Sequence, residues 1–458
     1  MSDLGHLPIV VVGAGPVGLA AAAHLVGRGL DVKVYEAEDT VGAHVRQWGH
    51  VRLFSSWKYN VDAAARDLLE KDGWQEPDGE GYPTGAELVE RYLVPLSRTP
   101  ELGPVIETGL RVAGIGREGL DKANSRGRAE RPFVLTLVDT AGGTRQIRAR
   151  AVIDAAGTWG TPNPLGADGR PAAGEIDASE AVAYGIPDVL GRDRATYAGR
   201  TTVVVGAGHS AANVLIDLAR LAEDAPGTAS LWVTRGSNLA RVYGGGSADQ
   251  LAERGALGGR LRVLVQDGRL TLVTGFAVSG VVRAGARFQL SGETADGRRM
   301  LDPVDRIIVA TGQRPDLGPT RELRLDLDPG LESVRSLGPL IDPNLHSCGS
   351  VPPHGHRQLS HPEPGFYTVG IKSYGRAPTF LMMTGYEQVR SVAAALAGDL
   401  IAADDVHLTL PETGVCTLLA DQPDAACCGP SSDGHAAAAP GRPPTLEPRT
   451  TSCCGTAA

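Results

Sequence analysis

The sequence predicts an α/β protein with two similar three-layer domains, because one pattern of strand, glycine turn and helix occurs twice. The first copy is VVVGAGPVGLAAAA at residues 10–23, and the second is VVVGAGHSAA at residues 203–212. In each copy a short β-branched run, typical of a strand buried on both faces, leads into a helix rich in small residues. A second strand then follows, in DVKVYEAE at 31–38 and in ASLWVTR at 229–235. Each copy is therefore a β-α-β unit.

The remaining elements follow from apolar patterning in chain order. Residues 42–59 read as a loop, and VDAAARDLLEKDG at 61–73 as an amphipathic helix closed by glycine. Further strands are expected in FVLTLVD, ARAVIDAAG, VDRIIVATGQRPD and GFYTVGIKSYG, and a closing helix in TFLMMTGYEQVRSVAAALAG. From residue 412 the chain is rich in Ala, Pro, Gly and Ser, which predicts a disordered tail.

Composition excludes several function classes. The 458 residues carry a formal net charge of −9, whereas a general nucleic-acid binder needs a basic face. No stretch approaches the roughly 20 apolar residues that a membrane helix requires. The N-terminus lacks the basic segment of a signal peptide. We therefore expect a cytoplasmic protein that binds neither nucleic acid nor membranes.

The first glycine turn, GAGPVG, predicts a dinucleotide site. Gly13 allows a tight turn, Gly15 lets backbone amides approach a pyrophosphate, and Gly18 lets the helix pack closely on the strand. Pro16 stands at the start of the helix, where unpaired N–H groups and the dipole favour phosphate. Glu36 ends the second strand at the spacing where a carboxylate accepts hydrogen bonds from ribose hydroxyls.

The second glycine turn differs in two ways. Gly206 and Gly208 are followed by Ala211, a permitted third residue, and Ser210 can add a hydroxyl to the phosphate site. Arg235 replaces the acid at the end of the second strand, and a guanidinium can pair with the 2′-phosphate that a carboxylate would repel. The site therefore favours NADPH over NADH. The alternative is an exposed arginine that merely ends the strand.

Four motifs together resemble the flavoproteins with two dinucleotide-binding domains, which include flavin-containing monooxygenases and pyridine-nucleotide disulfide reductases. They are GAGPVG with Glu36, DAAGT at 154–158, GAGHSA at 206–211 and ATGQRPD at 310–316. The resemblance implies two Rossmann-like domains, FAD on the first and NADPH on the second, with Ala156, Gly157 and Gly312 at the cofactors. It implies an FAD domain in two parts, 1–165 and 303–411, an NADPH domain at 166–302 inserted between them, and a tail at 412–458. A homodimer is one assembly that the resemblance leaves open.

The loop at residues 42–59, after the first β-α-β unit, distinguishes the disulfide reductases from the monooxygenases of this group. It contains no cysteine, so the dithiol relay of disulfide reductases is excluded there. We expect a monooxygenase-like oxidoreductase in which NADPH reduces FAD and the reduced flavin acts on a small molecule. The Phe-Gly-His signature of monooxygenases is missing, and Asp193 and Tyr197 stand where its His and Tyr would be. No side chain is assigned as a catalytic acid or base.

Other flavin contacts are expected from the resemblance. The loop that wraps the flavin in this group contains Arg46, Trp48, Ser55 and Trp57. Each of them is either a flavin contact, which we expect of Arg46 and Trp57, or a packing residue. The last FAD strand of reductases usually ends in Gly-Asp, whereas this chain has Gly370-Ile371-Lys372. Lys372 can neutralise a phosphate or stabilise reduced flavin, or it is a solvated lysine on a turn. The helix starting near residues 379–380 can aim its N-terminus at the flavin ring.

The tail holds two adjacent cysteine pairs, Cys427-Cys428 and Cys453-Cys454. Adjacent cysteines are poor structural disulfides but offer two soft thiolates for Hg(II), Cu(I) or trivalent arsenic. Mercuric reductase, a member of the same group, carries such a pair near its C-terminus. An oxidoreductase for soft metals or metalloids, with a role in metalloid resistance, is therefore the second hypothesis, and a metal-sequestering flavoprotein the third. The alternatives to metal binding are that the tail has no role or that one of its cysteines is a resolving thiol.

One Pro/Gly-rich segment concentrates donor side chains: His346, Cys348, His354, His356 and His361. Their spacing matches no zinc pattern. Metal ligands, a loop facing the substrate, or polar turn residues are the three interpretations.

Overall fold

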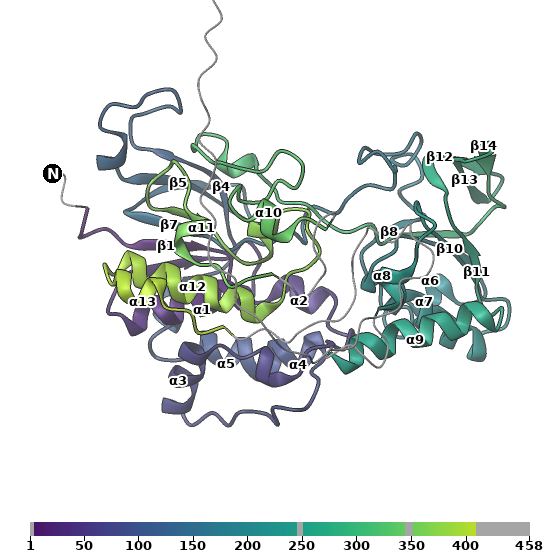
Figure 1. Ribbon diagram of the computed structural model, residues 1–458, viewed down its shortest axis with the longest axis horizontal. Helices are drawn as coiled ribbons and strands as arrows, with labels where there is room; N and C mark the ends of the chain where they lie inside the picture. The colour runs from purple at the N-terminus through teal and green to yellow at the C-terminus, as the bar shows by residue number, and fades with distance from the viewer. Residues whose placement is uncertain (1–3, 245–250, 344–350, 409–458) are drawn as a thin grey trace, which may run out of the picture. The chain divides into compact units, whose positions relative to one another are not determined.

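The computed structural model describes residues 4–244, 251–343 and 351–408 of the chain (Figure 1). Within these ranges, two five-stranded parallel sheets have the orders β16-β7-β1-β2-β3 and β11-β10-β9-β15-β8, and two three-stranded antiparallel sheets have the orders β4-β5-β6 and β12-β13-β14. The strands are β1 (Ile9–Val12), β2 (Val32–Tyr35), β3 (Ile106–Glu107), β4 (Leu110–Arg117), β5 (Phe133–Asp139), β6 (Thr144–Ala149), β7 (Ala151–Asp154), β8 (Val182–Tyr184), β9 (Thr201–Val205), β10 (Ala229–Val233), β11 (Thr271–Val273), β12 (Ala277–Ala284), β13 (Arg287–Thr294), β14 (Gly297–Met300), β15 (Arg306–Val309) and β16 (Phe366–Thr368).

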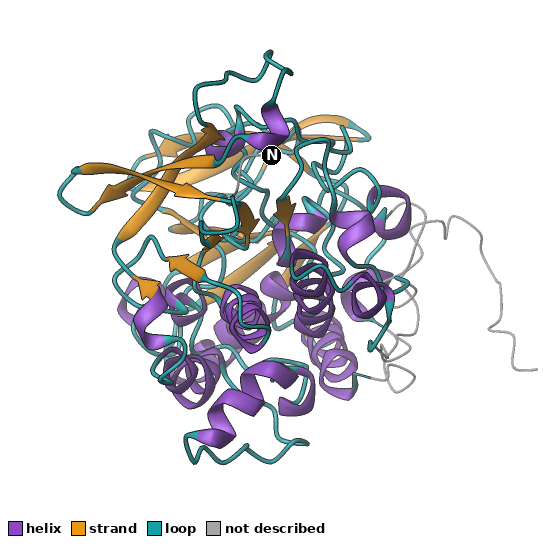
Figure 2. Cartoon of the chain, turned by 90° about the vertical axis from the view of Figure 1, so that its left-hand side faces the viewer, coloured by secondary structure: helices purple, strands orange, loops and turns teal. Residues whose placement is uncertain are grey.

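The helices connect these strands. They are α1 (Pro16–Gly27), α2 (Ala43–Gln47), α3 (Ala63–Lys71), α4 (Gly85–Leu88), α5 (Val94–Ser97), α6 (Arg194–Tyr197), α7 (His209–Asp224), α8 (Ala240–Tyr243), α9 (Ala252–Gln266), α10 (Gly338–Ile341), α11 (His356–Leu359), α12 (Met382–Leu396) and α13 (Leu400–Asp404). Figure 2 colours the helices purple and the strands orange. Residues 42–59, expected to be a loop, contain α2 and the short 3-10 helix η1 (Trp57–Tyr59).

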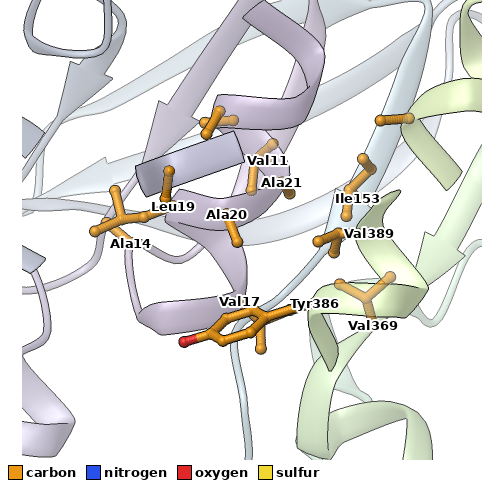
Figure 3. Close-up of a cluster of buried hydrophobic side chains, with 14 of the residues drawn as sticks. Val11, Ala14, Val17, Leu19, Ala20, Ala21, Ile153, Val369, Tyr386 and Val389 are labelled. Carbon is orange, nitrogen blue, oxygen red and sulfur yellow. The ribbon is translucent and has the colours of Figure 1, made fainter. Parts of the chain in front are cut away.

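The first parallel sheet is buried on both faces, because successive side chains of a strand point to opposite faces. Ile9 and Val11 of β1 belong to a cluster with apolar residues of α1 and α12. Val10 belongs to another cluster, with Phe133 and neighbouring residues of β5. Figure 3 shows part of the helix-side cluster, including Val11 and Val389 of α12. The layers are therefore helices, parallel sheet and antiparallel sheet.

The second parallel sheet repeats this arrangement. Val204 of β9 packs with Leu215 of α7 and Leu261 of α9, whereas its neighbour Val203 packs with Phe288 of β13. Two three-layer α/β domains were predicted from the sequence, and the fold confirms them.

The sheet pairing corrects one predicted boundary. β15 pairs with β9 and β8 of the second sheet, so its residues Arg306–Val309 belong to the inserted domain. The second part of the first domain therefore does not begin at residue 303. The chain rejoins the first sheet at β16, which pairs with β7. The insertion itself is as predicted, since every strand of the second parallel sheet lies between β7 and β16 in the chain.

Candidate functional site

The first glycine turn follows β1 and leads into α1. Gly13 has φ +95°, and a Cβ there would lie 2.9 Å from the carbonyl oxygen of Ala155. A Cβ at Gly18 would lie only 1.9 Å from the carbonyl oxygen of Gly13, which fixes how closely α1 packs on the turn. By contrast, no atom lies within 4 Å of a Cβ built on Gly15. The turn is therefore closed towards β7 and open at Gly15.

Glu36 is held beside this turn immediately after β2. Its carboxylate accepts hydrogen bonds from the backbone N–H of Ala14 at 2.7 Å and from that of Glu38 at 3.0 Å. The residue is 9% exposed and lines a cavity. A buried carboxylate needs such donors, and these two orient its oxygens at the cavity wall.

The cavity has a volume of about 650 Å³ and lies at the carboxyl ends of β1, β2 and β7. Ligand pockets commonly occupy about 300–1,000 Å³ and lie at such strand ends. Eight residues that the sequence assigned to cofactor binding line it: Gly13, Gly15, Pro16, Glu36, Ala156, Gly157, Gly370 and Lys372. Phe380 and Met382, at the start of α12, also line it, where the sequence placed a helix N-terminus.

Lys372 forms a buried ion pair at this wall. Its Nζ donates to Oδ2 of Asp154 at 2.7 Å, and the two side chains are 4% and 3% exposed. Asp154 ends β7, and Lys372 lies in the 3-10 helix η7 (Gly370–Tyr374), which follows the neighbouring strand β16. Lys372 is therefore not a solvated lysine on a turn, and its charge is balanced by Asp154.

The second glycine turn has the same construction. Gly206 has φ +139°, and a Cβ there would lie 2.2 Å from the carbonyl oxygen of Ala310, whereas a Cβ on Gly208 would meet no atom within 4 Å. The indole nitrogen of Trp232 donates to the carbonyl of Gly206 at 2.7 Å and anchors the turn. Ser210 lines a second cavity of about 430 Å³ with Gly312, at the ends of β8 and β15.

Arg235 lies outside the lining of both cavities. Its guanidinium is exposed and donates to the carbonyl oxygen of Ala167 at 2.9 Å. Its pairing with a 2′-phosphate stays a prediction.

The two cavities share part of their walls. Five residues line both: His44, Arg111, Trp159, Gly160 and Gln313. The motifs DAAGT and ATGQRPD are joined there, because Thr158 donates to the side-chain oxygen of Gln313 at 3.2 Å. The backbone N–H of Arg314 also donates to the carbonyl of Thr161 at 3.0 Å.

Arg46 and Trp57 are not among the lining residues of either cavity. Arg46 pairs with Glu90 at the surface. Trp57 is 3% exposed and packs in the helix-side cluster beneath the guanidinium of Arg91. Flavin contact by these two residues stays a prediction. Trp48 of the same loop does line the larger cavity, together with Trp159.

The histidines of the Pro/Gly-rich segment serve local structure where they are described. His354 Nδ1 lies 3.0 Å from the carbonyl of Pro352, and its Nε2 lies 2.9 Å from the amide nitrogen of Gln388. His361 Nδ1 accepts from the backbone of Asp326, and burial lowers the pKa of His361 to about 4.

Residues 4–244, 251–343 and 351–408 contain no group of three or more His, Cys, Asp or Glu suited to a metal. His346, Cys348 and the pairs Cys427-Cys428 and Cys453-Cys454 lie outside these ranges.

Several lining residues had no role in the sequence interpretation. Asp154 and Gln313 stand inside the quoted motifs DAAGT and ATGQRPD, so the motifs were the signal that could have identified them. His44, Arg111 and Trp159 carry no motif signal. Chain folding alone brings them to the shared wall.

Within the described ranges, no helix is both long enough and apolar enough to cross a membrane.

Comparisons with known proteins agree with this architecture. Residues 11–70 match the family model described as an NAD(P)-binding Rossmann-like domain. No curated protein sequence matches the chain significantly.

Among solved structures, a bacillithiol disulfide reductase from Bacillus cereus aligns with TM-score 0.64 and 17% identity, covering 86% of this chain and 99% of its own. A cadaverine monooxygenase of desferrioxamine biosynthesis from Erwinia amylovora aligns with TM-score 0.60 and 14% identity, covering 89% and 99%. A flavin monooxygenase variant from Stenotrophomonas maltophilia aligns with TM-score 0.56 and 21% identity, covering 86% and 98%. The chain therefore has the fold of flavoproteins with two dinucleotide-binding domains, which these reductases and monooxygenases share.

Proposed function

We propose that this protein is an NADPH-dependent FAD oxidoreductase. One observation carries the proposal: the first glycine turn lines the larger cavity, Ser210 after the second glycine turn lines the smaller one, and five residues line both cavities. A hydride donor and a hydride acceptor must come into contact, and adjoining cavities allow this. When bound, FAD supplies the capacity to take a hydride and pass two electrons onward.

The residues of the larger cavity fit FAD. The space beside Gly15 leaves room for a pyrophosphate at the start of α1, where backbone N–H groups and the helix dipole favour phosphate. The fixed carboxylate of Glu36 can accept hydrogen bonds from ribose hydroxyls. Trp48 and Trp159 present indole rings, whose centroids lie 6.4 Å apart, to the same space.

The residues of the smaller cavity fit the nicotinamide cofactor. Ser210 and the open side of Gly208 lie at the start of α7, where the phosphates would bind. Arg235, two residues past the end of β10, would select the 2′-phosphate of NADPH.

The electron acceptor that we propose is dioxygen with a small organic substrate, as in a flavin monooxygenase. None of the residues that line the two cavities is a cysteine, so the lining supplies no dithiol as electron acceptor. Both the Erwinia amylovora and the Stenotrophomonas maltophilia structures are described as monooxygenases, which supports this choice.

The test begins with purified protein titrated with FAD. NADPH added without oxygen should bleach the flavin absorbance, and NADH should do so at higher concentration. Failure to bind FAD, or failure of NADPH to bleach it, would contradict the proposal. Rapid mixing of the reduced protein with oxygen then distinguishes dioxygen from other electron acceptors. A transient absorbance distinct from both reduced and oxidised flavin supports monooxygenation, whereas direct return to the oxidised spectrum points to another acceptor.

A second candidate acceptor is a soft metal or metalloid ion, favoured by the two adjacent cysteine pairs of the tail. Comparison of the full chain with a variant lacking residues 412–458 tests it. Metal-dependent NADPH oxidation should fall in the truncated variant, while NADPH still bleaches the flavin. Unchanged metal-dependent turnover would exclude delivery by the tail. Tight metal binding by the full chain without turnover would instead indicate sequestration.

A further inference from the structure

The wall shared by the two cavities contains one histidine, His44. Of the five residues that line both cavities, only His44 belongs to the residue type whose charge ordinarily changes between about pH 5 and 8. His44 is the second residue of α2, which begins directly after Gly42. Its ring edge faces Gly160, where a Cβ would lie 3.9 Å from Cε1 of the imidazole.

The other ionisable side chains along both walls are engaged with partners. The pairs are Glu36 with the backbone of Ala14, Arg111 with Glu38, Tyr35 with Glu107, Asp154 with Lys372, Asp316 with the backbone of Gly318, and Tyr184 with Glu175. On α2 itself, Arg46 pairs with Glu90. His44, in contrast, makes no hydrogen bond or ion pair with any residue in the described ranges.

Other histidines in this fold contribute to structure. His24 pairs with Asp62, His356 with Asp404, and His354 with Gln388. His44 differs from these three histidines because it lines two cavities. No residue of the described ranges bonds to either of its ring nitrogens.

The proposed reaction consumes one proton in addition to the hydride. NADPH transfers a hydride, which carries two electrons and one proton. Reduction of dioxygen to hydrogen peroxide consumes two electrons and two protons, so NADPH, one further H⁺ and O₂ give NADP⁺ and H₂O₂. If oxygen is instead inserted into an organic substrate, one further proton leaves in water. In either case a second proton must reach the oxygen that is being reduced.

We propose that His44 is the catalytic acid that delivers this proton. Its imidazolium N–H bond breaks, the proton goes to the reduced oxygen, and the neutral ring regains a proton from water. The inference rests on the proposed NADPH and FAD chemistry. It assigns a residue to the step in which oxygen is reduced. A positioned general acid typically contributes about 10²–10⁴ in rate.

The test uses the FAD-loaded full chain and the variants His44→Gln, His44→Ala and, as the matched control, His6→Gln at an exposed histidine. Each protein is reduced with one equivalent of NADPH without oxygen and then mixed with oxygenated buffer from about pH 5.5 to about pH 8. The measurements are the FAD dissociation constant, the rate of flavin bleaching by NADPH and the rate of flavin reoxidation.

For the wild type and for His6→Gln, we expect reoxidation to slow as the pH rises through the range in which imidazole loses its proton. His44→Gln should reoxidise at least about tenfold more slowly at the acidic end and show no such pH dependence. FAD binding and bleaching by NADPH should change by a smaller factor than reoxidation does. Added imidazole should restore reoxidation in His44→Ala.

The outcomes separate this inference from the proposed function. If the wild type fails to bind FAD or is not bleached by NADPH, the proposed function fails and the role of His44 fails with it. If bleaching is normal but His44→Gln keeps the wild-type pH profile, only the role of His44 is refuted. Loss of FAD binding in His44→Gln, with no rescue of His44→Ala by imidazole, would show a structural role instead.

Discussion

Replacing Gly18 with alanine should weaken FAD binding at the first dinucleotide site, although Gly18 does not line the cavity. The added methyl would lie 1.9 Å from the carbonyl oxygen of Gly13, where ordinary contact begins near 3.4 Å. Helix and turn must therefore separate by about 1.5 Å, and neither contact atom is a flexible side chain. Such overpacking costs about 1–3 kcal/mol, and a gain of about 1 kcal/mol in helix propensity offsets part of it.

The expected net loss is at most about 2 kcal/mol, which lowers Tm by roughly 4–8 °C for a domain of about 150–250 residues. Because the shift displaces Gly13 at the turn, FAD affinity should fall at least tenfold, equivalent to about 1.4 kcal/mol. Thermal unfolding of the apoprotein and a fluorescence titration with FAD measure the two effects separately.

Gly27→Ala at the end of the same helix is the matched control. No atom lies within 4 Å of a Cβ at Gly27, and the residue is exposed. It should gain up to about 1 kcal/mol in stability and bind FAD unchanged. The reasoning about close packing is refuted if Gly18→Ala matches the wild type in both Tm and FAD affinity.

Three further predictions concern charge. Arg235→Glu should raise KM for NADPH at least about tenfold and lower KM for NADH, as measured by steady-state kinetics. If the ratio of the two KM values stays as in the wild type, Arg235 does not select the 2′-phosphate. Lys372→Met leaves the buried Asp154 without its cation and should cost about 3–5 kcal/mol in urea unfolding, whereas adding Asp154→Asn should recover part of this loss. Burial raises the pKa of Asp217 to about 6, above its unfolded value near 3.9, so the folded state binds more protons between these values. Stability should therefore fall as pH rises from about 4 to about 6, and Asp217→Asn should remove that slope and add at most about 3 kcal/mol at pH 7.

The elements of both β-α-β units could be predicted because their signals are local. Ile9–Val12 and Thr201–Val205 are runs of apolar and β-branched residues next to glycine turns, and each run alone indicates a buried strand. The boundary at residue 303 could not be predicted in this way. The strand Arg306–Val309 resembles any other buried strand in sequence, and only its pairing with β9 assigns it to the inserted domain.

The residues that were predicted to bind cofactors divide in the same way, into those with a local sequence signal and those without one. Gly13, Gly15 and Pro16 of the first glycine motif line the larger cavity, because the motif itself encodes the turn geometry. Arg46 and Trp57 were assigned from their place in a loop, and the fold turns one to the surface and the other into the core. His44 stands in that same loop segment with no distinguishing pattern, and its position at both cavities depends on the start of α2 at Ala43.

The pairing of Lys372 with Asp154 changes how the larger cavity can act on a flavin. Considered alone, the lysine suggested a positive charge that stabilises reduced flavin. The two side chains are far apart in sequence and meet because β7 and β16 are neighbours, so no local pattern indicates the pair. Two opposite charges at 2.7 Å present a dipole with little net charge, and the field of a dipole falls off faster with distance than that of a free ammonium. If this view is correct, Asp154→Asn should raise the flavin reduction potential by exposing the lysine charge, and Lys372→Met should lower it. Equal potentials in both variants would mean that the pair only stabilises the fold.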